Sequence, residues 1–349
     1  MQTKPPIPIK VLVVDDSAYI RKVVTEMLSA EPRIQVVGTA RNGRDALEKV
    51  TELKPDVVTL DLIMPELDGV GFLREQMQRR RLPVIVVSIA SENGALVVSA
   101  LEAGALDFVQ KPTALASERV YEIQRDLIEK VLTAAAIEPA RLPVGISVPK
   151  EVLPLRKTAP LVDAVVLGIS TGGPQALTQL IPRLPADFPV PMAIVLHMPV
   201  GYTELFAARL NEISALEVIE ASEGDEMRPG RVLLAPAGRH LTFLRLQDRR
   251  VISHLDLRPL DSLHRPSVDV LFQSAAEVYG GRLLGVVMTG MGKDGTAGAA
   301  WIKAQGGTIL AEAEESCVVF GMPRAVIEAG LADEIVPLER MADAILEHS

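Results

Sequence analysis

Short apolar runs, each bounded by glycine, proline or aspartate, recur along the whole chain. The clearest are VLVV, DVVTL, PVIVVSIA, DAVVLGIS, PMAIVLH and LLGVVMTG. Continuous apolar runs of about four to eight residues are typical of strands that are buried on both faces of a parallel sheet. Segments with helical periodicity lie between them, such as AYIRKVVTEMLSA and GRDALEKVTEL. This alternation predicts an α/β protein.

The pattern divides the chain into two parts joined by a proline-rich segment. Five βα units fit the first part, with strands near 10–15, 34–39, 56–61, 83–89 and 106–110 and a last helix near 117–133. Right-handed crossovers would arrange them as a doubly wound parallel sheet. Prolines at 139, 143, 149, 154 and 160 then disfavour regular structure. We therefore predict a first domain over 1–133, a Pro-rich linker over 134–160 and a second doubly wound domain over 161–349.

The composition narrows the class of protein. With 349 residues, 48% of them hydrophobic, the chain can bury a core in each of two domains. A net charge of −9 disfavours binding to nucleic acid through bulk charge. The single cysteine, Cys317, excludes an internal disulfide and fits a reducing compartment. Neither a signal-peptide pattern nor a long apolar span is present, so we expect a cytoplasmic protein that is not embedded in a membrane.

Polar residues end several predicted strands of the first domain. VLVVDD ends on Asp15 and Asp16, and DVVTLD ends on Asp61. IVVS ends on Ser88, and DFVQKP contains Lys111. Such strand ends meet at the carboxyl edge of an open parallel sheet, where three carboxylates would repel unless a cation such as Mg²⁺ neutralised them. Asp61 is then a candidate nucleophile for a phosphoryl group, and the alternative is a set of solvated loop residues or helix caps.

The order and spacing of these motifs (DD, D…MPELDG, S and KP) resemble the response-regulator receiver family over about residues 9–133. The resemblance implies a flavodoxin-like fold and a Mg²⁺ ion bound by the three aspartates. It also implies that a histidine kinase phosphorylates Asp61. Ser88 and Lys111 would contact the phosphoryl oxygens, and Phe108 stands at the position of the family's switch aromatic.

A glycine-flanked serine opens the second domain. The strand DAVVLGIS runs into TGGPQALTQLI, which predicts a sharp turn at Ser170 and a helix with Pro174 in its first turn. Gly168, Ser170 and Gly172 have the G-x-S-x-G spacing of a nucleophile elbow. Amides at the helix start would bind an oxyanion, with Thr171 as a candidate donor. A glycine-rich turn that binds a phosphate or a nucleotide is the alternative.

A serine nucleophile needs a base that a third group orients. His197 ends the strand PMAIVLH, and Asp294 lies in MTGMGKDG after the strand RLLGVVM, so both should lie at the same sheet edge as the serine. His240, in LLAPAGRHL, is the rival base, whereas His254 and His264 fall in a charged stretch. We predict a Ser–His–Asp triad whose chain order differs from that of the α/β-hydrolases.

Six motifs extend this assignment over about residues 161–345: GISTGGPQAL, LHMPVGYTELFAARLN, GRVLLAPAGRHL, RPSVDVLFQSAAEVYG, VVMTGMGKDGTAGA and CVVFGMPRAV. Together they resemble the catalytic domain of chemotaxis protein-glutamate methylesterases, the CheB family. The resemblance implies that Ser170 is the nucleophile, His197 the general base and Asp294 the orienting carboxylate. Thr171 and Met291 fall at positions that shape the oxyanion hole.

Two positions depart from the family pattern. Leu196 stands where the family usually has Gln, and Ile169 where it usually has Ala. Neither is a triad position. Leu196 removes a polar group that would steady the loop or contact the substrate, so it bears on substrate preference more than on the chemistry.

The expected activity, taken from the resemblance, is hydrolysis of glutamate γ-methyl esters on chemoreceptors. Deamidation of receptor glutamines is expected too, because an amide differs only in its leaving group. The hydrolase needs no cofactor, and the receiver should cap the catalytic cleft until Asp61 is phosphorylated. Two other classes stay open: a non-enzymatic phospho-switch, and a nucleotide-binding output domain, although GISTGG lacks the second glycine of G-x-G-x-x-G.

Overall fold

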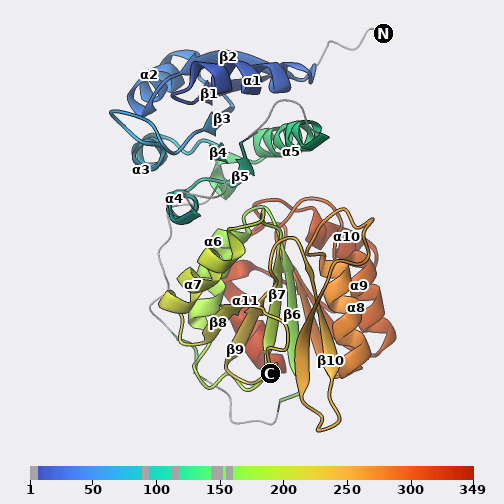
Figure 1. The fold of residues 1–349 in the computed structure, drawn as a ribbon. Coiled ribbons are helices and arrows are strands. Elements are labelled where there is room, and N and C mark those ends of the chain that lie inside the picture. Colours follow the sequence, from blue (N-terminus) through green and yellow to red (C-terminus); the bar gives the residue numbers. More distant parts are fainter. Residues whose placement is uncertain (1–6, 89–93, 112–117, 143–151, 155–159) are drawn as a thin grey trace. The chain divides into compact units, whose positions relative to one another are not determined.

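The computed structural model describes residues 7–88, 94–111, 118–142, 152–154 and 160–349 (Figure 1). The chain divides into two compact units, Met1–Ile146 and Ser147–Ser349, which we describe separately. Each unit contains a parallel sheet with helices on both faces, so the predicted α/β class is confirmed for both.

The N-terminal unit is a five-stranded sheet in the order β2-β1-β3-β4-β5, with parallel pairing throughout. This order is that of flavodoxin-like folds, in which the chain reverses its direction of growth between β1 and β3. Helix α1 packs beside α5, and α3 packs beside both α2 and α4. The elements are β1 (Ile9–Val14), α1 (Ala18–Ser29), β2 (Ile34–Ala40), α2 (Gly43–Leu53), β3 (Val57–Leu60), α3 (Gly69–Arg79), β4 (Val84–Ser88), α4 (Gly94–Glu102), β5 (Asp107–Gln110), α5 (Glu118–Ala135) and a short 3₁₀ helix η1 (Pro139–Arg141).

Side-chain caps define where the first helices begin. Asn42 accepts a hydrogen bond from the backbone N–H of Asp45 at 2.8 Å, and Asp68 accepts one from Gly71 at 2.6 Å. Each cap satisfies a backbone donor that has no partner within the helix. The strands between these helices are buried along most of their length, as their apolar runs predict.

The C-terminal unit has a seven-stranded, all-parallel sheet in the order β14-β13-β12-β6-β7-β9-β8. Its elements are β6 (Ala164–Ile169), α6 (Gly173–Leu180), η2 (Ile181–Arg183), β7 (Met192–Leu196), α7 (Thr203–Ile213), β8 (Glu217–Glu220), β9 (Arg231–Leu234), β10 (His240–Arg245), β11 (Val251–Asp256), α8 (Val268–Tyr279), β12 (Leu283–Val287), α9 (Thr296–Ala304), β13 (Thr308–Glu312), α10 (Met322–Glu328), β14 (Glu334–Val336) and α11 (Leu338–His348).

The three strands β12, β6 and β7 form the centre of this sheet and are buried at every position. Helices α8, α9 and α10 contact one another in succession on one side, and α6 contacts both α7 and α11 on the other (Figure 1). The chain starts at β6 and grows first toward β7 and later toward β12. The carboxyl end of β6 is therefore a topological switch point, where such sheets leave a crevice.

An antiparallel hairpin, β10–β11, was not predicted from the sequence. It pairs His240 with Asp256 at one end and Arg245 with Val251 at the other. The hairpin packs on α8, and the backbone N–H of Phe243 donates a hydrogen bond to Ser274 Oγ at 2.8 Å. The loop that leads from β11 to α8 is thereby carried toward the carboxyl edge of the main sheet.

About half of the predicted linker over 134–160 lies outside the described residues. Within it, α5 continues to Ala135 and η1 forms at Pro139–Arg141, so its first part contains helix. The domain bounds predicted from the sequence stay a prediction. Across the part of the chain that the structure describes, no helix has both the length and the hydropathy needed to cross a membrane.

Candidate functional site

Three carboxylates gather at the switch point of the N-terminal sheet. Asp15 and Asp16 follow β1, and Asp61 follows the neighbouring strand β3. One ligand atom from each residue lies within 4.8 Å of the others; Asp15 and Asp61 are buried and Asp16 is exposed. Such a set of oxygen donors, open to water on one side, fits a hard divalent cation that keeps part of its hydration shell.

A buried lysine bridges the two inner carboxylates. Lys111 Nζ lies 2.8 Å from Oδ2 of Asp15 and 2.8 Å from Oδ2 of Asp61. Burial raises the pKa of Asp61 even though the lysine opposes the shift. Burial would lower the pKa of Lys111, but its hydrogen bonds to the two carboxylates raise it above its usual range. The lysine therefore stays cationic beside the carboxylate that would carry a phosphoryl group.

The other two residues predicted for this site lie on neighbouring strands. Ser88 is buried at the end of β4, and its carbonyl oxygen accepts a hydrogen bond from the backbone N–H of Lys111 at 2.7 Å. Phe108 is buried within β5, and its carbonyl oxygen accepts a hydrogen bond from Lys130 Nζ at 2.7 Å. The structure thus brings Ser88 to the same edge as the carboxylates and places Phe108 further back along β5.

The candidate triad residues of the C-terminal unit follow the three central strands. Ser170 follows β6, His197 follows β7, and Asp294 lies in the turn after β12. Backbone hydrogen bonds join these strand ends directly. The N–H of His197 donates to the carbonyl of Ile169 at 3.2 Å, and the N–H of Ser170 donates to the carbonyl of Thr289 at 2.9 Å. The parallel sheet therefore fixes the positions of all three turns.

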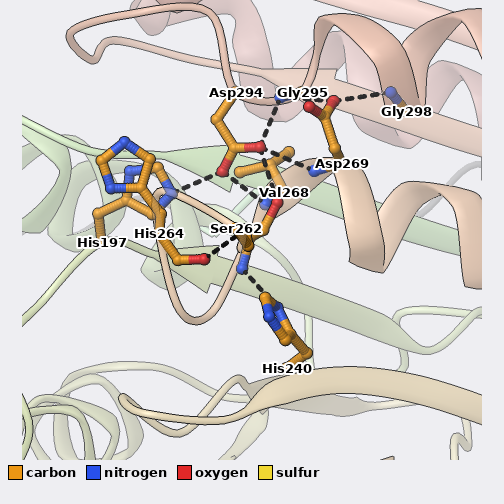
Figure 2. Close-up of polar contacts among 10 residues, drawn as sticks. His197, His240, Ser262, His264, Val268, Asp269, Asp294, Gly295 and Gly298 are labelled. Carbon is orange, nitrogen blue, oxygen red and sulfur yellow. Dashed lines mark hydrogen bonds and ion pairs between the residues drawn. The ribbon is translucent and has the colours of Figure 1, made fainter. Parts of the chain in front are cut away.

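The imidazole of His197 pairs with the Asp294 carboxylate. Nε2 of the ring lies 2.8 Å from Oδ2 of the aspartate (Figure 2). The two side chains are only 10% and 9% exposed, so water screens their interaction weakly. The second ring nitrogen, Nδ1, is buried and has no hydrogen-bond partner among the described residues. Because Asp294 occupies Nε2, Nδ1 is the nitrogen left to take a proton from a nucleophile.

Four further donors surround the Asp294 carboxylate, all at or near helix N-termini. Its Oδ1 accepts from Ser267 Oγ at 2.9 Å, from the N–H of Asp269 at 3.0 Å and from that of Gly295 at 3.1 Å. Its Oδ2 also accepts from the N–H of Val268 at 2.8 Å. Burial alone would raise the pKa of Asp294, but these bonds and the histidine hold it well below its usual range. The carboxylate therefore stays ionised and can stabilise an imidazolium.

Asp269 caps the helix α9 in the same way as Asp294 caps α8. It lies in the first turn of α8, and its Oδ1 accepts from the N–H of Gly295 at 2.9 Å and of Gly298 at 2.7 Å, at the start of α9 (Figure 2). Burial and the nearby Asp294 raise the pKa of Asp269. A Cβ at Gly298 would lie 2.5 Å from Phe272 Cβ, so only glycine allows the two helices to approach this closely. Asp294 thus caps α8, the helix that contains Asp269, and Asp269 caps α9, the helix that follows Asp294.

The turn that carries Ser170 is tightly packed. Gly172 has a positive φ of 79° and precedes α6, and the N–H of Gly173 donates to the carbonyl of Ser170 at 2.7 Å. A Cβ at Gly290 would lie 2.8 Å from Ser170 Cβ, so the backbone just before Met291 lies against the serine. Thr171, the residue directly after the serine, is buried. The two predicted oxyanion-hole residues thus belong to segments that flank the serine.

Comparisons with known proteins agree with this arrangement. The family model for CheB methylesterase matches residues 165–345, and that for the response regulator receiver domain matches residues 11–119. A Myxococcus xanthus protein named protein-glutamate methylesterase/protein-glutamine glutaminase 5 is 53% identical over 98% of this chain and 98% of its own length. The chain belongs to the CheB methylesterase family. Its N-terminal part is a response regulator receiver domain.

Two comparisons with Thermotoga maritima extend the family assignment. A protein-glutamate methylesterase/protein-glutamine glutaminase from that organism is 43% identical over 97% of this chain and 98% of its own length. A solved structure, the Thermotoga maritima CheB methylesterase catalytic domain, is 45% identical and covers 54% of this chain and 99% of that chain, with a TM-score of 0.52. A nucleotide-binding output domain, which the sequence left open, is therefore not favoured.

The rival histidine of this CheB-family chain has a different environment. His240 is fully buried, and its Nδ1 accepts from the N–H of Ser267 at 3.2 Å (Figure 2). Its Nε2 lies 3.3 Å from the carbonyl oxygen of Pro259. These partners require a neutral ring with the proton on Nε2. Burial lowers the pKa of His240, which favours the same neutral form. His240 supports Ser267, and through it Asp294, whereas His197 pairs with Asp294 directly.

The sequence analysis did not predict that a further histidine, His264, lies beside His197. His264, which the sequence placed in a charged stretch, stacks on His197 with ring centroids 4.1 Å apart and planes 19° apart (Figure 2). Ser262 Oγ donates to the carbonyl of His264 at 2.8 Å and helps to fix this loop. Nothing in the local pattern signals this contact, because it depends on the hairpin that carries the loop back to the sheet edge.

The two departures from the CheB-family pattern lie in the core. Leu196 and Ile169 are fully buried at the ends of β7 and β6. A Cβ at Gly173 would lie 2.7 Å from Leu196 Cδ1 and 3.0 Å from Ile169 Cγ1. Both side chains therefore pack against the first residue of α6 and support the serine turn through apolar contact.

Proposed function

We propose that this protein hydrolyses glutamate γ-methyl esters on chemoreceptors, deamidates receptor glutamines, and is regulated by phosphorylation of Asp61. The observation that carries the proposal is the contact of His197 with Asp294 beside the turn of Ser170, on three adjacent strand ends. The Myxococcus xanthus relative, with its printed methylesterase and glutaminase name, supports the choice of substrate.

The chemistry would follow acyl transfer to a serine. Ser170 Oγ attacks the ester carbonyl while its proton passes to Nδ1 of His197, and Asp294 stabilises the imidazolium. Donors around Thr171 and Met291 would stabilise the tetrahedral oxyanion. The imidazolium returns the proton to the departing methoxide, which leaves as methanol. Water then attacks the acyl-enzyme by the same route and releases the glutamate carboxylate and the free serine.

The receiver site would supply the control. Asp15, Asp16 and Asp61 would hold Mg²⁺, which neutralises charge on the transferring phosphoryl group. A histidine kinase would donate that group to a carboxylate oxygen of Asp61, while Lys111 and Ser88 contact its oxygens. The partners are thus a kinase and methylated chemoreceptors in the cytoplasm. The receiver would restrain the catalytic domain until the phosphoryl group shifts the balance between two states.

One assay tests this proposal. Methylated receptor membranes are mixed with the full-length protein, with and without a small-molecule phosphodonor, and released methanol is measured. We expect Ser170→Ala to abolish release and Asp61→Asn to leave a basal rate that the phosphodonor does not change. Methanol release by Ser170→Ala at the wild-type rate would instead favour a non-enzymatic phospho-switch.

A further inference from the structure

A buried carboxyl lies one strand away from the triad and has no part in the chemistry proposed above. Glu312 ends β13, which pairs with β12 at the same sheet edge, and its side chain is 0% exposed. A fully buried acid costs free energy unless its oxygens are hydrogen-bonded. Its contacts therefore show what it stabilises.

Both oxygens of Glu312 have partners. Oε2 accepts a hydrogen bond from the backbone N–H of Thr289 at 2.8 Å, in the turn after β12. Oε1 accepts one from Ser316 Oγ at 2.9 Å, and that hydroxyl in turn accepts from the backbone N–H of Leu338 at 2.9 Å. The carboxyl thus ties the turn after β12 to the segment that follows β13 and to the start of α11.

Thr289 passes this attachment on to the candidate nucleophile turn. Its carbonyl accepts from the N–H of Ser170 at 2.9 Å, and its Oγ1 donates to the carbonyl of Thr171 at 3.0 Å. The same Oγ1 accepts from the N–H of Val319 at 3.0 Å. Thr289 therefore contacts the backbone of both the serine and the neighbouring oxyanion-hole candidate, and Glu312 is the group that holds Thr289 from behind.

We propose that Glu312 is a positioning residue, which acts through Thr289 to hold Ser170 and Thr171 in the geometry needed for acyl transfer. The inference rests on the proposed function, because it takes Ser170 as the nucleophile. Its basis is the chain of hydrogen bonds from Glu312 through Thr289 to the serine turn.

The network is satisfied in either protonation state of the acid. Burial, helped by the negative charge of Glu339, raises the pKa of Glu312 to about 7, although the hydrogen bonds from Thr289 and Ser316 oppose this shift. When Glu312 is neutral, its O–H can donate to Ser316 Oγ, whose own proton turns to the carbonyl of Ala313 at 3.2 Å. Oε2 keeps the Thr289 N–H in both forms. A glutamine side chain can reproduce the neutral arrangement, whereas a shorter acid cannot reach.

The test compares Glu312→Gln, Glu312→Asp and Glu312→Ala in the full-length protein, with methanol release from methylated receptor membranes as the readout. A fluorophosphonate that labels the nucleophilic serine gives the concentration of active sites. Per active site, we expect Glu312→Gln to keep kcat within about twofold of wild type and Glu312→Ala to lower it about tenfold with KM unchanged. Glu312→Asp should also lower kcat several-fold, and it replaces the alanine variant in this comparison if that variant does not fold.

A matched control separates positioning from general destabilisation. Leu310→Ala removes a fully buried side chain from the same strand, β13, and should weaken the fold without changing kcat per active site. Wild-type kcat in Glu312→Asp, or an equal loss in Glu312→Gln and Glu312→Ala, would overturn the inference. If Ser170→Ala itself released methanol normally, the proposed function would fail instead, so the two failures are distinguishable.

Discussion

The two candidate sites occupy equivalent places in two parallel sheets but balance their charges in opposite ways. At the ends of β1 and β3, one buried lysine contacts two of three clustered carboxylates, which leaves net negative charge for a cation to balance. In the turn after β12, the Asp294 carboxylate already has five hydrogen-bond donors from the protein. The first site needs reversibly bound ligands to balance its charge, whereas the second is preorganised by hydrogen bonds from the protein.

This difference suits the two proposed roles. A site that is completed by its ligands can report whether they are present, because their binding changes the local charge. A site that is complete beforehand spends no energy on rearrangement during the reaction, which is the main source of electrostatic catalysis. The following predictions, from the largest expected effect to the smallest, test this contrast.

The strongest test replaces the preorganised carboxylate. Asp294→Asn should lower kcat about 10³- to 10⁴-fold, because an amide neither stabilises the imidazolium nor accepts from all five donors. Methanol release from methylated receptors measures the effect. Asp269→Asn is the matched control; it keeps an oxygen for the α9 amides and should leave kcat within about threefold while lowering stability by roughly 1–3 kcal/mol. A kcat for Asp294→Asn near that of wild type would contradict the assigned role.

Removal of divalent cations should separate the two sites. With EDTA, phosphorylation of Asp61 by a phosphodonor should slow by about a hundredfold, because the carboxylate cluster then lacks its neutralising charge. Ester hydrolysis without a phosphodonor should not change. Phosphoprotein formation and methanol release, measured in parallel with and without added Mg²⁺, check both halves. Equal inhibition of both reactions by EDTA would mean that the catalytic domain also needs a cation.

The raised pKa of Glu312 predicts a pH-dependent stability of the C-terminal unit. The folded pKa of about 7 lies above the ordinary value of 4.5, so the native state holds its proton more tightly than the unfolded chain. The free energy of unfolding should therefore fall by up to about 3 kcal/mol as the pH rises from about 4.5 to about 7.

Glu312→Gln should remove this slope, because an amide does not titrate. Trp301, the single tryptophan, lies in α9, so its fluorescence reports urea unfolding of this unit. The measurement is repeated at several pH values on both proteins. Parallel curves for wild type and Glu312→Gln over this range would show that other groups control the pH dependence.

The smallest expected effect concerns the stacked histidines. His264→Ala should lower kcat/KM by about three- to tenfold, because the His197 ring loses a neighbour that limits its rotation. His264→Phe keeps a flat ring and should stay within about twofold of wild type. An alanine variant as active as wild type would show that the Asp294 hydrogen bond alone fixes the ring.

The sequence predicted the position of a site residue well where a polar residue directly follows a buried apolar strand. Apolar runs that end in Ser170 and His197 correctly placed both residues at the carboxyl ends of β6 and β7. Because β6 lies between β7 and β12, the turn after β12 brings Asp294 to the imidazole. Such predictions succeed because parallel sheets place strand ends together whatever the connecting helices contain.

The supporting residues could not be predicted in this way. Ser267 donates its hydroxyl to the Asp294 carboxylate, and Thr289 and Glu312 act through backbone groups of distant segments. None of these contacts has a sequence signal. The choice between His197 and His240 likewise depended on tertiary contacts, because both stand beside buried strands. The β10–β11 hairpin was missed because its strands, HLTFLR and VISHLD, mix polar and apolar residues and lack the continuous apolar runs of the parallel strands.

The exchange of caps between Asp294 and Asp269 has a consequence for damaged or partly unfolded molecules. The carboxylate that the proposed reaction would need also links α8 to α9. Its donors include backbone N–H groups in the first turn of α8, and its position is fixed by the start of α9. A molecule in which these two helices have separated cannot aim Asp294 at His197. Hydrolysis should therefore stop when these two helices separate, before the sheet unfolds. A partly unfolded molecule would then be inactive, and would not hydrolyse esters outside the control of the receiver.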